Sequence, residues 1–160
     1  MQPGVSWSPD GRKIVIAAKA GSKDAFHIIN TRNGDSKKIP FDLEGVFTPK
    51  WSPDGMRLAF VGNKNSASDI YTIDLNTNEI VNLTSDIFSD SEPSWHPSSS
   101  KLLFVSDRGT KIDRVPTTAV DMIDHNFEQN NIYSIDINTK VVEKITNSSS
   151  NKNYPIYANT

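Results

Sequence analysis

The sequence predicts an all-β protein built of β-propeller blades, each a sheet of four antiparallel strands. Two observations lead to this prediction. A five-residue motif, Trp-Ser-Pro-Asp-Gly at residues 7–11, returns at 51–55 and again, in degenerate form, at 95–99, so the chain repeats every 44 residues. Each repeat also contains four short apolar or alternating segments separated by turn residues, and four strands in about 40–45 residues is typical of a propeller blade.

The first strand of each repeat ends at this motif. Its proline presets the backbone φ and its glycine supplies positive φ at little cost, so a tight turn follows the tryptophan. A residue that recurs at one position of every repeat usually packs in the core that the repeats share. We therefore interpret the motif residues as structural and expect Trp51 to be buried between two blades. The set comprises the tryptophans Trp7, Trp51 and Trp95, the capping carboxylates Asp10 and Asp54, and the turn glycines Gly11 and Gly55.

The three remaining strands of each repeat follow in a fixed order. The second strand is almost continuously apolar, as in residues 14–17, 58–61 and 102–105, which fits a strand with both faces covered. The third strand, at 69–75 in the second repeat, alternates along its length as a half-buried strand does. A turn cluster rich in Asn and Thr comes next, and a short fourth strand at 80–83 completes the repeat.

The third repeat contains one insertion. Residues 133–136, Tyr-Ser-Ile-Asp, match residues 71–74 at an offset of 62 instead of 44, so 18 additional residues lie between Val105 and Tyr133. We predict a single partial propeller over 1–160, with blades at 1–48, 49–92 and 93–154, an inserted loop at about 110–130 and the start of a further blade at 155–160.

Composition excludes several classes of partner. The net charge is −2, from 17 basic and 19 acidic residues, and neither sign forms a block, so a nucleic-acid backbone is not an expected partner. The longest apolar runs are far shorter than the roughly 18–20 residues of a membrane span. Without cysteine the chain has no disulfide, thiol nucleophile or Cys-type zinc site. We expect no cofactor.

The insertion is the one stretch that the repeat does not require, and loops on a rigid scaffold often carry function. We expect it to bind a protein or peptide partner. The residues predicted for this contact are Asp113, Arg114, Asp121, His125, Phe127 and Glu128. A second interpretation is a divalent-cation site, because Asp121, Asp124 and His125 would share one face of a helical turn.

Enzyme motifs do not occur in the sequence. It has no Gly-x-Ser-x-Gly elbow, no His-Glu-x-x-His pair, no phosphate-binding Gly-x-x-x-x-Gly-Lys loop and no dinucleotide loop. The three histidines belong to no motif. We therefore expect no catalytic residue within this chain.

The motif at 51–55, the segment Phe-Val-Ser-Asp-Arg at 104–108 and the segment at 132–136 together resemble the TolB-type, WD40-like propeller repeat. The resemblance implies the propeller fold and two functions. One is a non-enzymatic scaffold for protein binding, like the periplasmic protein TolB. The other is the substrate-gating propeller of a prolyl-oligopeptidase-like or tricorn-like peptidase, with its catalytic domain outside this chain. If the resemblance extends to location, the parent protein is periplasmic.

Three blades are fewer than the roughly four to eight of a closed propeller. An open arc of blades would expose an apolar face at each end. We expect the chain either to be part of a longer propeller chain or to form a homodimer in which two copies complete a six-bladed ring.

Overall fold

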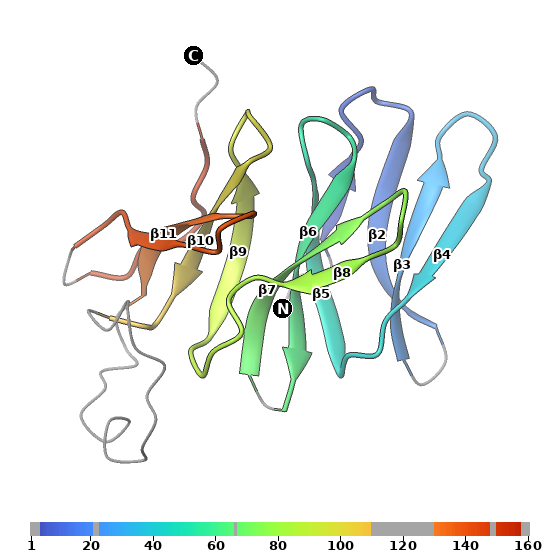
Figure 1. Cartoon of the computed structure of the whole chain (residues 1–160). Coiled ribbons are helices and arrows are strands. Elements are labelled where there is room, and N and C mark those ends of the chain that lie inside the picture. Colours follow the sequence, from blue (N-terminus) through green and yellow to red (C-terminus); the bar gives the residue numbers. More distant parts are fainter. Residues whose placement is uncertain (1–3, 21–22, 66, 110–129, 148–149, 158–160) are drawn as a thin grey trace.

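The strands follow the order that the repeat predicts. The computed structural model describes residues 4–20, 23–65, 67–109, 130–147 and 150–157, and these residues form three antiparallel sheets of four strands each, side by side in chain order (Figure 1). The first blade contains β1 (Val5–Trp7), β2 (Lys13–Ala20), β3 (Lys23–Asn30) and β4 (Ser36–Pro40). The second contains β5 (Gly45–Trp51), β6 (Arg57–Lys64), β7 (Ala67–Asp74) and β8 (Ile80–Asn82). The third contains β9 (Asp90–Trp95), β10 (Lys101–Ser106), β11 (Asn131–Asp136) and β12 (Val142–Lys144).

The all-β fold class is confirmed. Within each sheet every strand is hydrogen-bonded to the next one along the chain. Among the described residues, no helix has the length and apolarity that a membrane crossing requires.

The blade boundaries differ from those predicted. β5 begins at Gly45, four residues before the predicted boundary at 49, and β9 begins at Asp90, three residues before the predicted boundary at 93. Both strands contain an irregularity in their pairing, between Phe47 and Lys50 in β5 and opposite Leu103 and Val105 in β9. The strands continue through this bulge, whereas apolar patterning suggests that they stop there.

The repeat extends to backbone conformation. Left-handed φ angles of 67°, 76° and 58° occur at Gly11, Gly55 and Ser99, the last residue of each motif turn. The turns between third and fourth strands likewise hold Gly34, Asn78 and Lys140 at 77°, 60° and 59°. A third series comprises Thr48 in β5, Glu92 in β9 and Tyr154 after β12, with φ of 47°, 54° and 55°. Tyr154 therefore repeats, beyond β12, the bulge conformation of β5 and β9.

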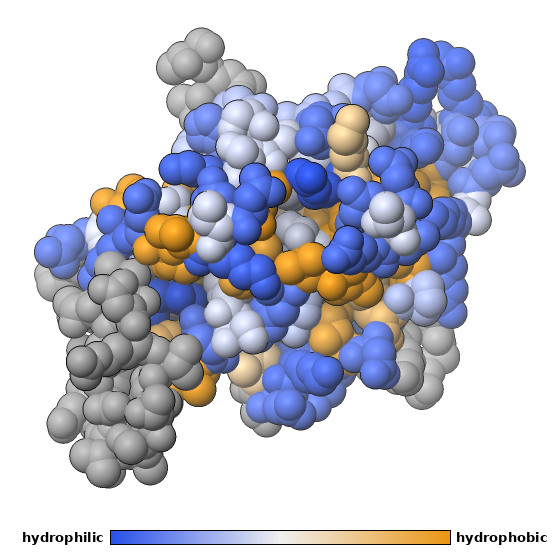
Figure 2. All heavy atoms as spheres, viewed as in Figure 1, coloured by the Kyte–Doolittle hydropathy of each residue, from blue (hydrophilic) through white to orange (hydrophobic). Residues whose placement is uncertain are grey.

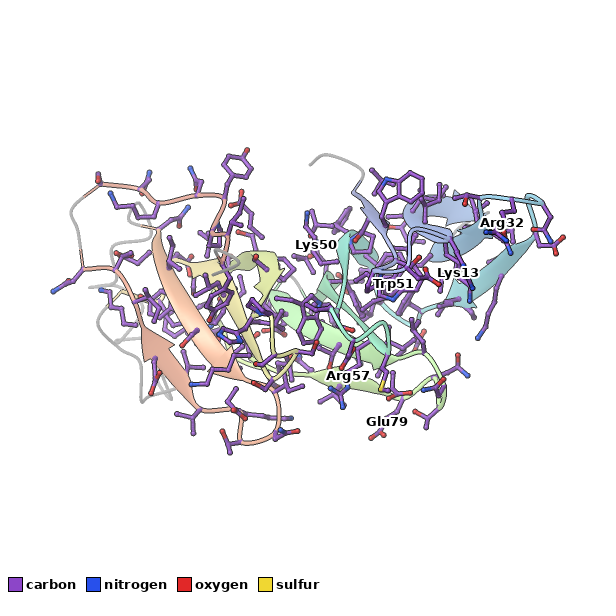
Figure 3. All side chains as sticks on the ribbon, turned by 90° about the horizontal axis from the view of Figure 1, so that it is seen from above. Lys13, Arg32, Lys50, Trp51, Arg57 and Glu79 are labelled. Carbon is purple, nitrogen blue, oxygen red and sulfur yellow. The ribbon has the colours of Figure 1, made fainter. Side chains whose placement is uncertain are left out.

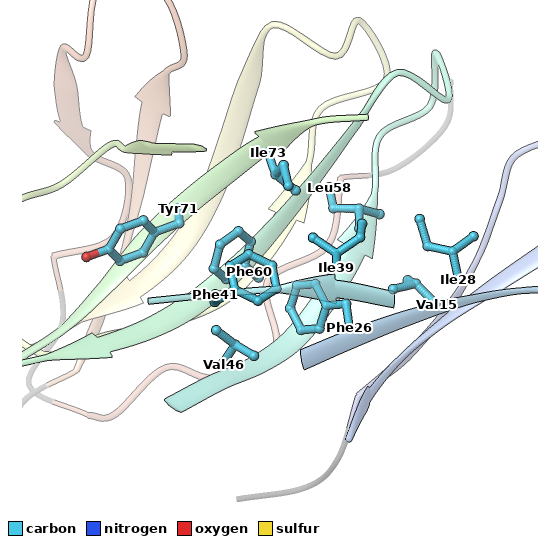
Figure 4. Packing of buried hydrophobic residues seen from close by; sticks show 10 residues of the cluster. All are labelled: Val15, Phe26, Ile28, Ile39, Phe41, Val46, Leu58, Phe60, Tyr71 and Ile73. Carbon is cyan, nitrogen blue, oxygen red and sulfur yellow. The ribbon is translucent and has the colours of Figure 1, made fainter. Parts of the chain in front are cut away.

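A core of aromatic and branched residues fills the space between the first and second blades (Figure 4). The first blade contributes Val15, Phe26, Ile28 and Ile39, and the second contributes Leu58, Phe60, Tyr71 and Ile73. Phe26 packs edge-on against Phe60, with their ring centroids 5.2 Å apart.

The second and third blades pack in the same way. Ala59, Val61, Ile70 and Leu83 of the second blade meet Trp95, Leu102, Phe104, Tyr133 and Ile135 of the third. These residues occupy the repeat positions of the first core, so each blade uses one face toward the preceding blade and the other toward the next. Apolar side chains also show as a band across the middle of the surface in Figure 2, with hydrophilic residues above and below it.

The three tryptophans differ in burial, and the expectation for Trp51 is wrong in degree. Trp51 is half-buried, lies between the first and second blades (Figure 3), and donates its Nε1–H to the carbonyl of Gly55 at 3.1 Å. Trp95 is 8% exposed and donates to the carbonyl of Lys50 in the second blade at 2.9 Å. Trp7 is 60% exposed. Burial of this position therefore depends on how closely the preceding blade approaches it.

The motif turns are held by side-chain hydrogen bonds. Asp54 accepts from the Ser52 hydroxyl at 2.6 Å and from the Met56 amide at 2.9 Å, and Asp10 accepts equivalent bonds from Ser8 and Arg12. The Ser8 hydroxyl, followed by the Arg12 amide, lowers the pKa of Asp10. Asp10 and Asp54 thus lie in the turns, where they bond to neighbouring residues.

Candidate functional site

Connections of the sheets lie on two opposite sides of the blades, because successive antiparallel strands run in opposite directions. One side, which we call the turn face, carries the motif turns and the turns between third and fourth strands. The other, the hairpin face, carries the β6–β7 hairpin, the β8–β9 connection (residues 83–89) and the connection from β10 to β11, which contains the insertion. The candidate site lies on the hairpin face.

A buried arginine occupies the end of β10. Arg108 is 2% exposed, and its Nη2 lies 2.7 Å from both carboxylate oxygens of Asp90 at the start of β9. Its Nη1 lies 3.0 Å from Asp86 in the β8–β9 connection, and its Nε–H donates to the Ser106 hydroxyl at 2.9 Å. One guanidinium thus joins the β8–β9 connection, which leads from the second blade to the third, to the residues that follow β10.

Aromatic rings surround the guanidinium on its remaining sides. Its central carbon lies 5.0 Å from the ring centroid of Phe104, 5.5 Å from that of Tyr133 and 5.6 Å from that of Phe88. At these separations the ring quadrupoles attract a cation, and they also exclude water. Burial raises the pKa of Tyr133 to about 12, so its hydroxyl keeps its proton.

Three carboxylates share the surroundings of this single cation. One oxygen each of Asp69, Asp86 and Asp90 lies within 4.8 Å of the others. Burial raises the pKa of Asp90 to about 7, against the lowering effect of Arg108, and burial also raises the pKa of Asp86. The guanidinium supplies the positive charge that the group requires, so we assign no metal to it.

Asp69 belongs to a second network that borders the first. Its carboxylate accepts from the Asn82 amide at 2.8 Å and from the Thr84 hydroxyl at 3.2 Å, and Asn82 also donates to the Tyr71 hydroxyl at 3.1 Å. These groups border an open hollow of about 500 Å³ on the hairpin face. The hollow is lined by Lys64, Asn65, Ala67, Asp69, Tyr71, Asn82, Ser85, Asp86 and Ile87.

The base of the insertion is fixed beside Arg108. The Tyr133 hydroxyl donates to the carbonyl of Gly109 at 2.6 Å, and the β10–β11 ladder pairs residues as far as Ser106 with Asn131. Both ends of the insertion therefore start from ordered, hydrogen-bonded positions of the third blade.

The predicted partner and metal residues lie outside the described residues. They are Asp113, Arg114, Asp121, Asp124, His125, Phe127 and Glu128. The predicted loop therefore remains a prediction, both as a partner site and as a cation site.

Sequence reasoning missed the charged network at the base of the loop. The signal was present: Ser-Asp-Arg at 106–108 directly follows a continuously apolar strand, where a charged residue is buried only if it is paired. Its partners Asp86 and Asp90 precede it by 22 and 18 residues and match no motif.

Comparison with known proteins agrees with the fold. The family model described as TolB beta propeller domain matches residues 1–113. No curated protein matches the sequence. The chain superposes on TolB from Acinetobacter baumannii with a TM-score of 0.72 and 25% identity, over 92% of this chain and 33% of that one.

Two further structures share the fold. A putative TolB from Agrobacterium tumefaciens has a TM-score of 0.66 and 20% identity, over 87% of this chain and 47% of that one. The β-propeller domain of the Trilobed protease from Pyrococcus furiosus has a TM-score of 0.61 and 18% identity, over 91% of this chain and 42% of that one. The chain thus spans a third to a half of the length of these relatives. Because the family model covers more than two thirds of the sequence, the chain belongs to the TolB β-propeller domain family.

Proposed function

We propose that the chain is a non-enzymatic binding scaffold that recognises a protein or peptide with its hairpin face. The inserted segment 110–130 and the hollow between the β6–β7 hairpin and the β8–β9 connection form the recognition surface. The parent protein is TolB-like and periplasmic in this proposal.

The buried pairing of Arg108 with Asp86 and Asp90 carries the proposal. It fixes Arg108 and the adjoining Gly109, where the insertion begins, against the connection that borders the hollow. A rigid base reduces the conformational entropy that a loop loses when it binds.

The lining of the hollow suits a peptide. Tyr71 offers an aromatic ring with a hydroxyl, Ile87 is 38% exposed, and the exposed Lys64 lines the same hollow as the carboxylate of Asp69. Apolar contact together with hydrogen-bonding groups of both charges is the usual chemistry of a peptide-binding surface.

Selection from a random peptide library displayed on phage, against the purified 160-residue chain, tests the proposal. Peptides that are enriched are measured by fluorescence anisotropy. The variant that combines Lys64→Ala with Ile87→Ser, and the variant Phe127→Ala, are each expected to weaken binding at least about tenfold. Arg32→Ala, an exposed position on the turn face (Figure 3), is the control and should leave the affinity unchanged. Failure to enrich any peptide, or equal sensitivity of binding to the control, overturns the proposal.

A second candidate function is the substrate-gating propeller of a peptidase. The fold shared with the propeller domain of the Trilobed protease favours it, although that likeness concerns the fold alone. The sequence of the whole gene that encodes the chain distinguishes the scaffold function from the peptidase function. A downstream α/β-hydrolase or tricorn-like module supports the peptidase, and an upstream signal peptide with a small α/β domain supports the scaffold. In either case the purified chain is expected to hydrolyse neither peptides nor esters, and measurable turnover would contradict both.

A further inference from the structure

The second blade holds a buried tyrosine in a fixed position at the hollow of the hairpin face. Tyr71 is 6% exposed and lines the hollow. Its ring stacks on Phe60, with the ring centroids 5.5 Å apart, and its hydroxyl points away from the core (Figure 4). A Cβ atom at Gly62 would lie 2.7 Å from the ring, so glycine at that position leaves the room that the ring occupies. The hydroxyl is therefore held in one place.

The side-chain amide of Asn82 sets the direction of the Tyr71 hydrogen. The main-chain amide of Ser85 donates to Asn82 Oδ1 at 2.9 Å, so Nδ2 is the atom that faces Asp69 and Tyr71. Its hydrogens go to Asp69 Oδ2 at 2.8 Å and to the Tyr71 hydroxyl oxygen at 3.1 Å. Burial, followed by the Asp69 carboxylate, raises the pKa of Tyr71, so the hydroxyl keeps its hydrogen. Among the residues that the structure describes, none accepts this hydrogen.

Asp69 offers an acceptor beside this donor. Its Oδ1 accepts from the Thr84 hydroxyl at 3.2 Å and from the Asp86 amide at 3.4 Å. Its Oδ2 accepts from Asn82 and from no other described residue, although a carboxylate oxygen accepts two hydrogen bonds. The hollow thus presents a hydroxyl that donates and a carboxylate oxygen that accepts, bonded to the two hydrogens of one nitrogen.

The third blade shows which group this tyrosine position binds. Tyr133 occupies the repeat position of Tyr71, and its hydroxyl donates to the main-chain carbonyl of Gly109 at 2.6 Å. An amide oxygen of the chain itself therefore accepts the hydrogen in the third blade. In the second blade no described residue supplies the equivalent oxygen.

The surroundings of the two tyrosines also correspond, with one substitution. The Thr84 hydroxyl donates to Asp69 at 3.2 Å, and the Thr146 hydroxyl donates to Asn131 at 3.2 Å. The second blade thus has a carboxylate where the third has a carboxamide. Both oxygens of an aspartate accept, whereas an asparagine has one oxygen and one NH₂ group. The substitution makes this position an acceptor only.

We propose that the hollow binds the primary carboxamide of a glutamine or asparagine side chain in the bound peptide, an inference that rests on the proposed function. The carboxamide oxygen accepts from Tyr71, and its NH₂ group donates to Asp69 Oδ2. A carboxamide carries its acceptor and its donor on separate atoms, as these two separate groups require. A carboxylate side chain lacks the hydrogen for Asp69, and a lysine or arginine lacks the acceptor for Tyr71.

The shape of the hollow suits a side chain. Tyr71 and Asp69 are each 6% exposed, whereas Ile87 is 38% exposed and residues 64–65 of the β6–β7 hairpin are exposed. The two hydrogen-bonding groups therefore lie deep, and the exposed residues lie at the rim. A side chain that enters from solvent passes its methylene groups along Ile87 and brings its carboxamide to the deep groups. Because these groups are already fixed, binding costs little ordering of the protein.

Titration of the isotopically labelled 160-residue chain, followed by nuclear magnetic resonance, tests the inference. The probes are N-acetyl methylamides of L-glutamine, L-methionine, L-glutamate and L-lysine. The glutamine probe is expected to bind about tenfold more tightly than each of the others, because only its side chain makes both hydrogen bonds. The resonances that shift should belong to residues that line the hollow.

Tyr71→Phe removes the hydroxyl and keeps the ring that stacks on Phe60. It should reduce the preference for the glutamine probe over the methionine probe to about twofold or less. Tyr154→Phe is the matched control, since Tyr154 is 79% exposed and does not line the hollow, and it should leave all four affinities unchanged. Circular dichroism checks the fold of both variants. If Tyr71→Phe does not fold, the comparison of the four probes on the wild type decides.

Equal affinity for the four probes, tightest binding of the lysine probe, or no binding of the glutamine probe overturns the inference. A preference for glutamine that a folded Tyr71→Phe chain retains also overturns it. The peptide library separates this inference from the proposed function. Enriched peptides with glutamine or asparagine at one common position support both, and enriched peptides without such a position support the proposed function while overturning this inference. If no peptide is enriched, the proposed function fails and the titration still decides whether the hollow binds a carboxamide.

Discussion

The Nη2 atom of Arg108 lies 2.7 Å from both carboxylate oxygens of Asp90; Asp90 begins β9, and Arg108 lies two residues after the neighbouring antiparallel strand β10. Both side chains are almost fully buried. Paired in this way they stabilise the geometry of the third blade, but each depends on the other, because a single buried charge without its partner is costly. Asp86 and Asp69 increase the negative charge around the pair, so three carboxylates surround one guanidinium. Substitutions at Arg108 and Asp90 test the effect of this excess of negative charge.

Removal of the guanidinium should destabilise the fold strongly. Arg108→Ala is expected to lower the free energy of unfolding by about 3–5 kcal/mol, because it leaves Asp90 buried without a cation. The free energy of unfolding of Arg108→Lys should lie between that of Arg108→Ala and that of the wild type, since an ammonium cannot replace a planar guanidinium against both carboxylates. Urea denaturation measures both. Arg32→Ala, at an exposed position, should change the same quantity by no more than about 0.5 kcal/mol, and a comparable loss there would refute the assignment.

Stability should fall as the pH rises from about 4 to about 7. Burial raises the pKa of Asp90 to about 7 in the folded chain, while in the unfolded chain it returns to the usual value of 3.8. Between these values the folded state binds more protons than the unfolded state, so raising the pH favours unfolding. The charged and titratable groups that interact with Asp90 are Arg108, Asp86 and Tyr133, and the raised pKa of Asp86 acts in the same direction.

Thermal unfolding at pH 5, 6, 7 and 8 measures this dependence. The melting temperature of the wild type should decrease across the series, and that of Asp90→Asn should depend less on pH. The turn carboxylates Asp10, Asp54, Asp74 and Asp136 have lowered pKa values, and their contribution is lost only below the usual aspartate range. They therefore do not interfere. Equal pH dependence in the two proteins would exclude Asp90 as the titrating group.

The three tryptophans should differ in their contribution to stability. Trp95→Ala is expected to cost about 3–5 kcal/mol, as for other large core side chains, because Trp95 is 8% exposed between the second and third blades. Trp7→Ala should cost less than about 1 kcal/mol, since it is 60% exposed. Similar losses for both substitutions would mean that the repeat position, and not contact with a preceding blade, sets the cost.

The turns between third and fourth strands allow a reciprocal test. Lys140 has a φ of 59° where the first blade has Gly34 at 77°. A left-handed conformation costs an ordinary residue roughly 1–2 kcal/mol more than glycine. Lys140→Gly should therefore raise the melting temperature, and Gly34→Lys should lower it. A shift of both in the same direction would show that these two turns are not energetically equivalent.

The sequence predicted the number of blades, the order of strands and the motif turns, because these depend on residues close together in one repeat. It did not predict where β5 and β9 begin, since the bulges at Thr48 and Glu92 interrupt the apolar pattern that marks a strand. It overestimated the burial of Trp51, because burial depends on how the adjoining blade approaches.

The charged network could be predicted only in part. Arg108 follows an apolar strand, so its burial was open to inference from the sequence alone. Its pairing with Asp86 and Asp90 depends on how the β8–β9 connection folds back against the end of β10. At the 44-residue repeat Asp86 corresponds to Asp42, but Arg108 corresponds to Lys64 and Asp90 to Val46, so the repeat alone does not give the pairing.

The β10–β11 ladder has a consequence for protein engineering. Twenty-four residues separate Ser106 from Asn131, where the equivalent hairpin of the second blade has only two between Lys64 and Ala67. On loop-closure grounds the difference costs only about 2 kcal/mol, and the paired strands on either side keep their register. The β10–β11 connection is thus a suitable place to insert a foreign sequence. A peptide tag, an epitope or a small domain could replace residues 110–129, which leaves Arg108 and the paired strands of the blade in place as the carrier.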